Sequence, residues 1–371
     1  MNKSIFFAFV IFLLLFSVFS YFFVDPNLLY LKDIYTGFAF SNRFLTTIFY
    51  VSFILIFFVF YGIFIWLAYR KKMRSKDVVM LLSFTVGILV FSYPAMLSYD
   101  IFNYMATSKV LFFYKENPYI IMPIEFTGDP LLYFTHAANK IALYGPFWII
   151  LTVIPYLFGF GNFIVTLLSF KFFIVIFYLF TVFLIWKMSK NIVSVVLFSF
   201  NPLVAIEILV SGHNDIVMIF LAFFSLFLLM RKKIFLGILF FVLSIFIKYV
   251  TIFLVPIFLY VVWRLIRNKV IDWIKVYFFS SLLMLIAFLL SPIREEIYPW
   301  YAIWFIPFAF SAPNKKILLY TSIVFSFSLL LRYTPYMLIG TYAGQTPFIK
   351  EIISFVPPVL VFAYYVFKKK I

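Results

Sequence analysis

Long apolar runs alternate with short basic clusters along this 371-residue chain. Basic residues that flank membrane-spanning helices are enriched on the cytoplasmic side. Two clusters on the same side enclose an even number of crossings, so each interval between clusters predicts a hairpin of two spans. The six intervals then predict twelve transmembrane helices with both termini in the cytoplasm. The clusters are Lys3; Arg70, Lys71, Lys72, Arg74 and Lys76; Lys187 and Lys190; Arg231, Lys232 and Lys233; Arg264, Arg267, Lys269 and Lys275; Lys315 and Lys316; and Lys368, Lys369 and Lys370.

The apolar interval from 234 to 263 tests this scheme because it is too long for one crossing. Thirty residues in a single helix measure roughly 45 Å, whereas the hydrocarbon core of a bilayer is about 30 Å thick. We therefore predict two short helices with Lys248 and Tyr249 at the turn between them.

The longest polar interruption runs from 98 to 162 and predicts a large outer loop. Within it, the apolar run Pro146 to Phe158 is too short to span a membrane, and we predict an interfacial helix there, opened by the Tyr-Gly-Pro turn at 144–146. The span that follows contains Lys171, which either snorkels to the outer interface or has a function. The first apolar run, Ile5 to Val24, is interpreted as a span that is retained rather than a signal peptide.

Composition places the chain among integral membrane proteins. Hydrophobic residues make up 66% of it, charged residues only 12%, and the mean hydropathy is +1.13, so we expect residues 1–371 to form a single all-α membrane domain. The absence of cysteine excludes disulfides and thiolate chemistry. The net charge of +17 does not indicate nucleic-acid binding, because 20 of the 30 basic residues lie in the seven clusters and are explained by topology and by contact with membrane lipids.

Charged and aromatic residues that are hard to explain structurally fall on the predicted outer turns. Together they offer a carboxylate, an imidazole, cations and an aromatic wall, which suits a site for a phosphate and a polyol. An ammonium within the 234–263 run costs roughly 2.5 to 3.5 kcal/mol on insertion scales, so Lys248→Met should stabilise that hairpin. The candidates are Asp100, Tyr104, His213, Asn214, Asp215, Lys248, Arg294, Tyr298, Trp300 and Tyr301.

Each candidate also has a structural interpretation. Asp100 could cap a helix or be a solvated loop charge. His213 and Asp215 could form a turn in which Asp215 caps the following helix, because Asp is a favoured N-cap, or, less plausibly, a pair of metal ligands. The aromatic residues at 298–301 could belong to the belt that many membrane proteins place at the interface.

Short motifs across about residues 80–310 resemble the GT-C superfamily of polytopic glycosyltransferases, particularly its polyprenyl-phosphate-mannose-dependent mannosyltransferases. The matching segments are SYDIFNY with Asp100, NPY at 117–119, YGP at 144–146, FNPL at 200–203 leading to GHND at 212–215, SIFIKY at 244–249 and YPWYAIWFIP at 298–307.

The resemblance implies a GT-C-like bundle of about twelve transmembrane helices with a long, catalytic first outer loop. It implies inverting transfer of a hexose, with mannose favoured, from a polyprenyl-phosphate donor to a lipid, glycan or protein hydroxyl on the outer face of the cell membrane. Asp100 corresponds to the general base of the family. No cofactor is expected. Some relatives carry an acidic pair where this chain has Asp100 alone, so metal dependence stays open, as does the acceptor class.

The residue types suit this chemistry. The leaving polyprenyl phosphate is already an anion, so cations rather than a second acid are needed, and we assign donor-phosphate binding to Lys248, Arg294 and His213. Substrate contact or orientation is assigned to Tyr104, Asn214, Asp215, Tyr298, Trp300 and Tyr301.

Two other functions remain open from sequence. A lipid-linked oligosaccharide flippase or small-solute transporter is also compatible with twelve spans, although transporters place their polar residues near the bilayer midplane and often show internal repeats. No convincing repeat is evident here. A structural membrane scaffold would leave the shared side of Asp100, His213, Asp215 and Lys248 unexplained.

Overall fold

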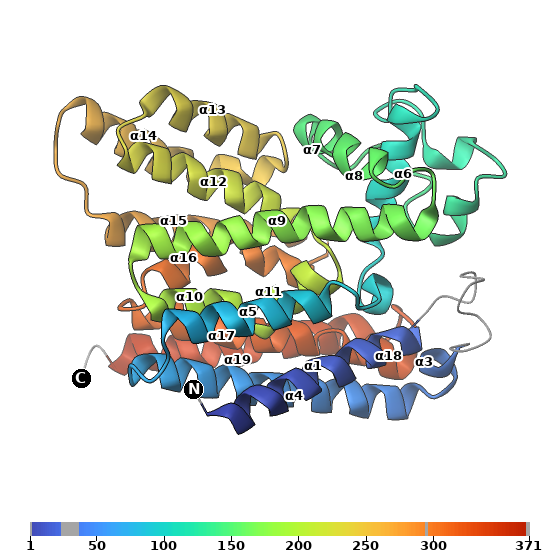
Figure 1. Ribbon diagram of the computed structural model, residues 1–371, viewed down its shortest axis with the longest axis horizontal. Coiled ribbons are helices and arrows are strands. Elements are labelled where there is room, and N and C mark those ends of the chain that lie inside the picture. The colour runs from blue at the N-terminus through green and yellow to red at the C-terminus, as the bar shows by residue number, and fades with distance from the viewer. Residues whose placement is uncertain (1, 24–36, 294–295, 369–371) are drawn as a thin grey trace.

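The computed structural model describes residues 2–23, 37–293 and 296–368, and these residues form helices and turns without any strand (Figure 1). The predicted all-α class is confirmed. The α-helices are α1 (Lys3–Ser20), α3 (Phe38–Ser41), α4 (Arg43–Tyr69), α5 (Ser75–Leu89), α6 (Asp100–Phe112), α7 (Pro146–Leu151), α8 (Val153–Leu157), α9 (Phe163–Ser189), α10 (Ile192–Ser199), α11 (Pro202–Ala205), α12 (Asp215–Met230), α13 (Ile234–Ile245), α14 (Val255–Ile266), α15 (Trp273–Leu290), α16 (Ile306–Ser311), α17 (Lys316–Leu331), α18 (Thr334–Ile339) and α19 (Thr346–Lys368).

Seven helical segments among the described residues are long and apolar enough to cross a membrane, and an eighth is possible if the bent pair at 192–210 forms one span. The shorter apolar helices include α12 and α13, which the sequence scheme counts as crossings. The count of twelve therefore stays a prediction. The seven segments are Lys3–Phe23, Arg43–Tyr69, Phe163–Ser189, Tyr249–Ile266, Trp273–Ile293, Lys316–Ile339 and Thr346–Lys368.

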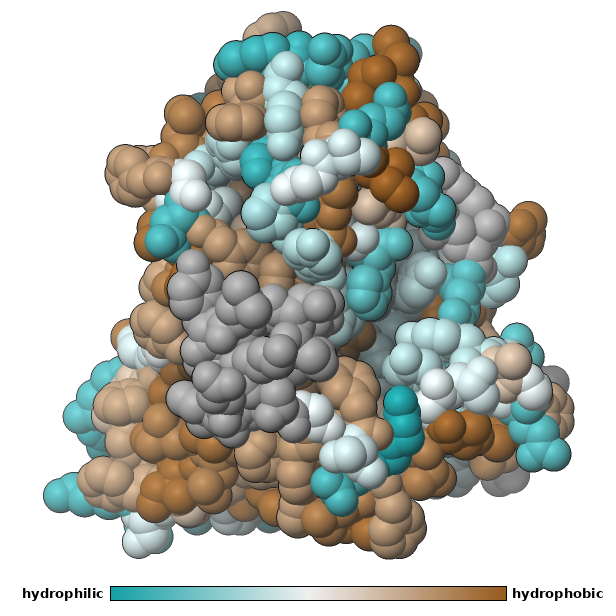
Figure 2. All heavy atoms as spheres, turned by 90° about the vertical axis from the view of Figure 1, so that its right-hand side faces the viewer, coloured by the Kyte–Doolittle hydropathy of each residue, from teal (hydrophilic) through white to brown (hydrophobic). Residues whose placement is uncertain are grey.

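The connections that carry the basic clusters lie at one end of the bundle. In Figure 1 the end of α19 and the connections α4–α5, α9–α10 and α14–α15 lie at the left, and α1 begins on the same side. Helix α6 and the segment 113–145 lie toward the opposite end, which Figure 2 shows face on, with hydrophilic side chains gathered over its upper part. This separation agrees with the charge pattern of the sequence. Which end faces the cytoplasm stays a prediction.

Interlocking phenylalanine rings join the first two long helices. Phe9 of α1 meets Phe64 of α4 edge to face, with ring centroids 4.9 Å apart, and Phe12 meets Phe57 at 5.3 Å. Edge-to-face packing is favourable because the positive ring edge meets the negative ring face. The many phenylalanines of the sequence thus build the contact between helices as well as supply hydropathy.

The predicted break near Lys248 is confirmed. Helix α13 ends at Ile245, and a 3₁₀ helix, η6 (Tyr249–Leu254), leads into α14, so Lys248 sits in extended conformation between two short helices. The turn at 144–146 lies against this break. The backbone N–H of Gly145 donates to the carbonyl of Ile247 at 3.0 Å, and that of Phe147 donates to the carbonyl of Phe246 at 3.1 Å.

The apolar run from 146 to 158 was predicted to be helical, and it forms the two short helices α7 and α8. Pro146 occupies the first turn of α7, where its missing N–H costs no hydrogen bond. Its position at the membrane interface stays a prediction.

The chain between 192 and 210 is helical but bent by 56° at Asn201. The Asn201 side chain accepts from the backbone N–H of Val204 at 3.2 Å and donates to Ser326 Oγ at 3.0 Å, so it caps α11 and holds it to α17. A π-helical segment, η5 (Ile206–Val210), follows. The break directs the chain toward the residues from 211 to 215.

Lys171 does not snorkel to the surface. Its side chain is 2% exposed, and its ammonium group donates to the backbone carbonyls of Leu89, at 3.5 Å, and Ser92. These carbonyls lie at the end of α5, where a helix leaves its last carbonyl groups without intrahelical partners. Lys171 therefore joins α9 to the end of α5, shortly before the chain reaches Asp100.

Candidate active site

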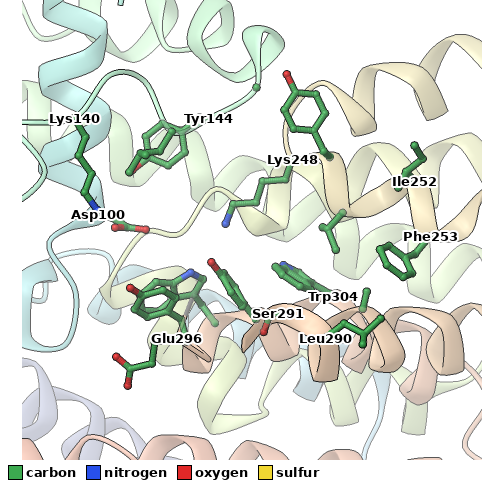
Figure 3. A pocket seen from close by; sticks show the side chains of 18 residues that line it. Asp100, Lys140, Tyr144, Lys248, Ile252, Phe253, Leu290, Ser291, Glu296 and Trp304 are labelled. Atoms are coloured by element: carbon green, nitrogen blue, oxygen red, sulfur yellow. The ribbon is translucent and has the colours of Figure 1, made fainter. Parts of the chain in front are cut away.

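A cavity of about 700 Å³ lies between the turn before α7, the break at Lys248 and the segment after α15. Asp100 and Lys248 point toward each other across it (Figure 3). The remaining lining residues are Lys140, Leu143, Tyr144, Gly145, Tyr249, Val250, Ile252, Phe253, Ala287, Leu290, Ser291, Glu296, Tyr298, Trp300, Tyr301 and Trp304.

Asp100 is the first residue of α6, and its carboxylate is partly open to the cavity, with 24% of the side chain exposed. The N-cap position belongs to Tyr99, whose side chain makes no capping hydrogen bond. The interpretation of Asp100 as a cap is therefore wrong. Burial raises the pKa of the Asp100 carboxyl above its ordinary value, and the nearby charges of His213 and Lys248 partly offset that rise.

Lys248 is fixed by a carboxylate and an aromatic ring. Its Nζ lies 2.9 and 2.8 Å from the two oxygens of Asp215, a buried residue in the first turn of α12, and 5.3 Å from the centre of the Tyr301 ring. The indole N–H of Trp304 donates to the same carboxylate at 2.6 Å. Asp215 thus orients Lys248 and does not cap α12, which is preceded by Asn214 without a side-chain cap.

Aromatic rings form one wall of the cavity. Tyr298 and Trp300 stack with centroids 4.6 Å apart, and Tyr301 stacks on Trp304 at 4.2 Å. These residues lie at and within the 3₁₀ helix η8 (Pro299–Trp304). The wall is part of the interior, so the interpretation of 298–301 as a simple interfacial belt does not describe it.

His213 lies behind this wall and is fully buried. Its ring stacks on Trp300 with centroids 4.0 Å apart. Nδ1 lies 2.9 Å from the backbone carbonyl oxygen of Glu207 and 3.2 Å from Oε2 of the same residue, and Nε2 lies 3.1 Å from Ser98 Oγ and 3.9 Å from Asp100 Oδ2. Burial by itself lowers the pKa of His213, but the hydrogen bond and charge of Glu207, together with Asp100 and Asp215, outweigh it and raise that pKa above its ordinary value.

The N-terminal domain of the alpha-(1→6)-mannopyranosyltransferase family matches residues 25–266, which is more than half of the chain. The chain belongs to this family. Its members are mannosyltransferases, so the protein is a glycosyltransferase, and its long apolar helices make it a membrane protein. No curated protein and no solved structure is significantly similar to the chain.

The family match confirms the predicted resemblance and favours an enzyme over a transporter or scaffold. The matched region and the region of resemblance overlap from residue 80 to residue 266. Asp100, His213, Asp215 and Lys248 lie within the match, whereas the aromatic wall at 298–304 lies after it.

Four predicted site residues of this mannosyltransferase do not line the cavity, namely His213, Tyr104, Asn214 and Asp215, the last of which acts through Lys248. His213 is stacked under Trp300 and has partners on both ring nitrogens, so a direct contact with a donor phosphate is wrong for this conformation. Tyr104 and Asn214 are also buried, and each donates to the other: the tyrosine hydroxyl to Asn214 Oδ1 at 3.2 Å and the Asn214 backbone N–H to that hydroxyl at 3.3 Å. They hold α6 against the start of α12 instead of touching substrate.

Arg294, which was also predicted to bind the donor phosphate, lies outside the described residues. The described ranges contain no group of three or more His, Asp or Glu side chains placed to hold a metal ion, and metal binding by His213 and Asp215 as a pair stays a hypothesis.

Several residues of the site were not predicted. Lys140 and Tyr144 enter the cavity from the outer loop, Glu296 lies just before the aromatic wall in the chain, Trp304 is the last residue of η8, and Glu207 contacts His213. Tyr144 and Trp304 lie in the YGP and YPWYAIWFIP segments that carry the resemblance, and Glu296 lies on a predicted outer turn, but none of the three was assigned to the site, and Lys140 gave no signal. Glu207 did give one, because it is a lone carboxylate within an apolar run, where ionisable residues are rare and usually functional.

Proposed function

We propose that this mannosyltransferase moves a mannosyl group from a polyprenyl-phosphate donor to an acceptor hydroxyl, with inversion, on the outer face of the membrane. The observation that carries the proposal is the position of Asp100 and Lys248 on opposite sides of one cavity. A base and a phosphate-binding cation separated in this way match the two ends of an in-line displacement at the anomeric carbon.

Asp100 acts as the general base. The acceptor oxygen forms a bond to the anomeric carbon while its proton passes to the Asp100 carboxylate, and the bond from that carbon to the phosphate oxygen breaks. A carboxylate whose pKa is raised by burial is a better proton acceptor than an exposed one, provided that it is ionised when the acceptor binds.

Lys248 binds the phosphate that leaves. The electron pair of the broken bond stays on the phosphate oxygen, so negative charge grows there and no proton donor is required. A lysine ammonium has three donors, and Asp215 accepts from Lys248 with both carboxylate oxygens. The remaining donor is available to a phosphate in the cavity, where a fixed cation stabilises the developing charge.

Apolar residues continue the cavity away from Asp100 and suit the lipid part of the donor. Val250, Ile252 and Phe253 of η6 face Leu290 at the end of α15. Ile252 is 55% exposed and Leu290 is 44% exposed, which in a membrane protein indicates contact with lipid. A polyprenyl chain can leave the cavity on this side while its phosphate stays at Lys248.

The linkage in the family's description supports a choice of donor and acceptor stereochemistry. An inverting transfer that forms an α-linked mannoside requires a β-linked mannosyl phosphate. A (1→6) linkage requires a primary hydroxyl, carried by C6 of a hexose, as the acceptor. We place this reaction on the outer face because the cavity lies away from the connections that carry the basic clusters.

Transfer with purified protein tests the proposal. Full-length enzyme in lipid nanodiscs is incubated with radiolabelled β-mannosyl polyprenyl phosphate and an α-mannoside acceptor, and the product is digested with a mannosidase specific for α-(1→6) bonds. We expect labelled product to form and the mannosidase to release the labelled mannose from it. An enzyme that uses GDP-mannose but not the lipid donor would contradict the donor assignment, and transfer from the α-linked lipid would contradict inversion.

A further inference from the structure

Glu207 is a buried carboxylate that the transfer reaction described above does not use. It is fully buried on the π-helical segment η5, directly after the bend at Asn201. A buried carboxylate is costly unless it is well partnered, and π-helical segments are frequent at functional sites. Its two oxygens differ: Oε1 accepts from the hydroxyl of Tyr333 at 2.9 Å, whereas Oε2 lies 3.2 Å from His213 Nδ1 and accepts no hydrogen bond.

The contacts of Glu207 determine where His213 carries its first proton. Nδ1 lies 2.9 Å from the backbone carbonyl oxygen of Glu207, and a carbonyl can only accept. Nδ1 is therefore an N–H in either charge state of the ring. The nitrogen that gains or loses a proton is Nε2, on the side that faces Ser98 and Asp100.

The other ring nitrogen of His213, Nε2, is directed at Asp100. Nε2 lies 3.9 Å from Asp100 Oδ2, and Ser98 Oγ, 3.1 Å from Nε2, also accepts from the backbone N–H of Asp100 at 3.3 Å. Trp300 covers the ring and separates it from the cavity, and an aromatic face favours a cation placed on it. His213 therefore lies between two carboxylates, with the buried Glu207 on its Nδ1 side and Asp100, which lines the cavity, on its Nε2 side.

We propose that Glu207 is a positioning residue for the transfer: it fixes the ring of His213 through Nδ1 and balances its positive charge, so that the imidazolium keeps Asp100 ionised until the acceptor proton arrives. This role rests on the proposed function, because it takes Asp100 as the base. Glu207 itself touches neither substrate nor the reacting atoms.

Other charged and titratable groups lie near Glu207, His213 and Asp100 and contribute to the electrostatic potential at these three residues. His213 also experiences the charge of Asp215, whose own charge is opposed by Lys248. The charged or titratable groups near Asp100 are Lys248, Asp215, Tyr104 and Tyr144, and those near Glu207 are Tyr333 and Tyr50.

The proposal predicts the direction of a pH shift. In Glu207→Gln the backbone carbonyl of residue 207 still accepts from Nδ1–H, but the side-chain charge is lost, so the pKa of His213 falls and less of the ring is protonated at a given pH. The pKa of Asp100 then rises, because the opposite charge near it is reduced. An opposite charge at this distance changes a carboxyl pKa by about one to three units, so the acidic limb of kcat/KM moves to higher pH by that amount, with about tenfold lower activity per unit at pH values below the limb.

Two measurements test this. The pH dependence of kcat/KM is recorded for wild type, Glu207→Gln, Glu207→Asp and the control Asp129→Asn, which removes a carboxylate that binds Lys109 and Tyr114 in the outer loop, away from the cavity. A shifted limb in Glu207→Gln, partial return in Glu207→Asp and an unshifted limb in the control are expected. Equal loss at every pH in Glu207→Gln would overturn the proposal and leave Glu207 a structural residue.

The second measurement does not depend on activity. The chain has two histidines, so ¹⁵N-histidine labelling in a His136→Gln background leaves His213 as the one imidazole signal. We expect protonation of Nδ1 at all pH values, titration of Nε2, and a lower titration midpoint in Glu207→Gln. An unchanged midpoint would overturn the link between Glu207 and His213. If this link is found but Asp100→Asn still transfers mannose, the proposed base is wrong instead.

Discussion

Gly145 lies directly against the backbone of Phe246. A Cβ atom at position 145 would be 2.1 Å from the carbonyl oxygen of Phe246 and 2.6 Å from its carbonyl carbon. The glycine has an ordinary backbone conformation, with φ −66°, so space and not dihedral freedom requires it. This contact joins the outer loop to the break that carries Lys248.

Gly145→Ala should therefore separate the two sides of the cavity. The added methyl group meets backbone atoms that cannot rotate away, and overpacking of this kind costs about 1 to 3 kcal/mol. We expect a lower Tm together with weaker donor binding, because Lys248 moves relative to Tyr144. Gly62→Ala, which has no atom within 4 Å of its added Cβ, is the control: it should leave donor binding unchanged and should not lower Tm, because alanine is favoured over glycine inside a helix such as α4. Full donor affinity in Gly145→Ala would show that the contact does not position the site.

Asp100→Asn should remove transfer while preserving the fold. The amide has nearly the shape of the carboxylate but accepts no proton, and general-base catalysis contributes about 10² to 10⁴-fold. We expect kcat to fall within that range and donor binding to persist, as measured by single-turnover transfer and by binding of the labelled lipid. An Asn variant with half the wild-type kcat would exclude Asp100 as the base.

Cysteine labelling can establish the orientation in the membrane, because the chain contains no native cysteine. A cysteine at Ile120, an exposed position in the outer loop, should react in intact cells with a membrane-impermeant maleimide. A cysteine at Lys72, in the basic cluster between α4 and α5, should react only after the cells are opened. The opposite pattern would invert the topology. Although the sequence places 213 on the outer side, a cysteine there should stay unlabelled in both cases, because His213 is fully buried.

The sequence was sufficient for those parts of the fold that depend on length and charge. The break at Lys248 follows from a run too long for one crossing, and the grouping of the basic connections follows from the positive-inside rule. The close approach of Gly145 to Phe246 could not be predicted in this way. It joins residues far apart in sequence, and a Tyr-Gly-Pro turn indicates a turn but not the backbone against which it packs.

The site was predicted only in part, because contacts between residues far apart in the chain are not visible in local sequence patterns. Asp100, Lys248 and the aromatic wall were expected on one side, and the structure places them around one cavity. The burial of His213 depends on a tertiary stack with Trp300, which no local pattern indicates. Glu207 was missed although a carboxylate in an apolar run requires a partner, and a search for that partner among the nearby residues would have suggested His213, six positions later.

Asp215 reverses the effect expected for one substitution. From the sequence, Lys248→Met should stabilise the hairpin because it removes a charge from an apolar stretch. In the structure the same substitution leaves the fully buried Asp215 carboxylate without its cation, and breaking a buried ion pair by removing one partner costs about 3 to 5 kcal/mol. We therefore expect Lys248→Met to lower both stability and transfer.

A double-mutant cycle separates the two losses. In Lys248→Met with Asp215→Asn no buried charge is orphaned, and the amide oxygen still accepts from Trp304, so Tm should recover toward wild type. Transfer should not recover, because no cation remains at that position for the leaving phosphate and its contribution grows as the bond breaks. Asp215→Asn alone keeps Lys248, which is 17% exposed in its side chain and can reach the phosphate, and should retain more activity than either methionine variant. Thermal unfolding and steady-state kinetics of the four proteins measure both couplings. Recovery of kcat in the double variant would mean that Lys248 serves only to balance Asp215.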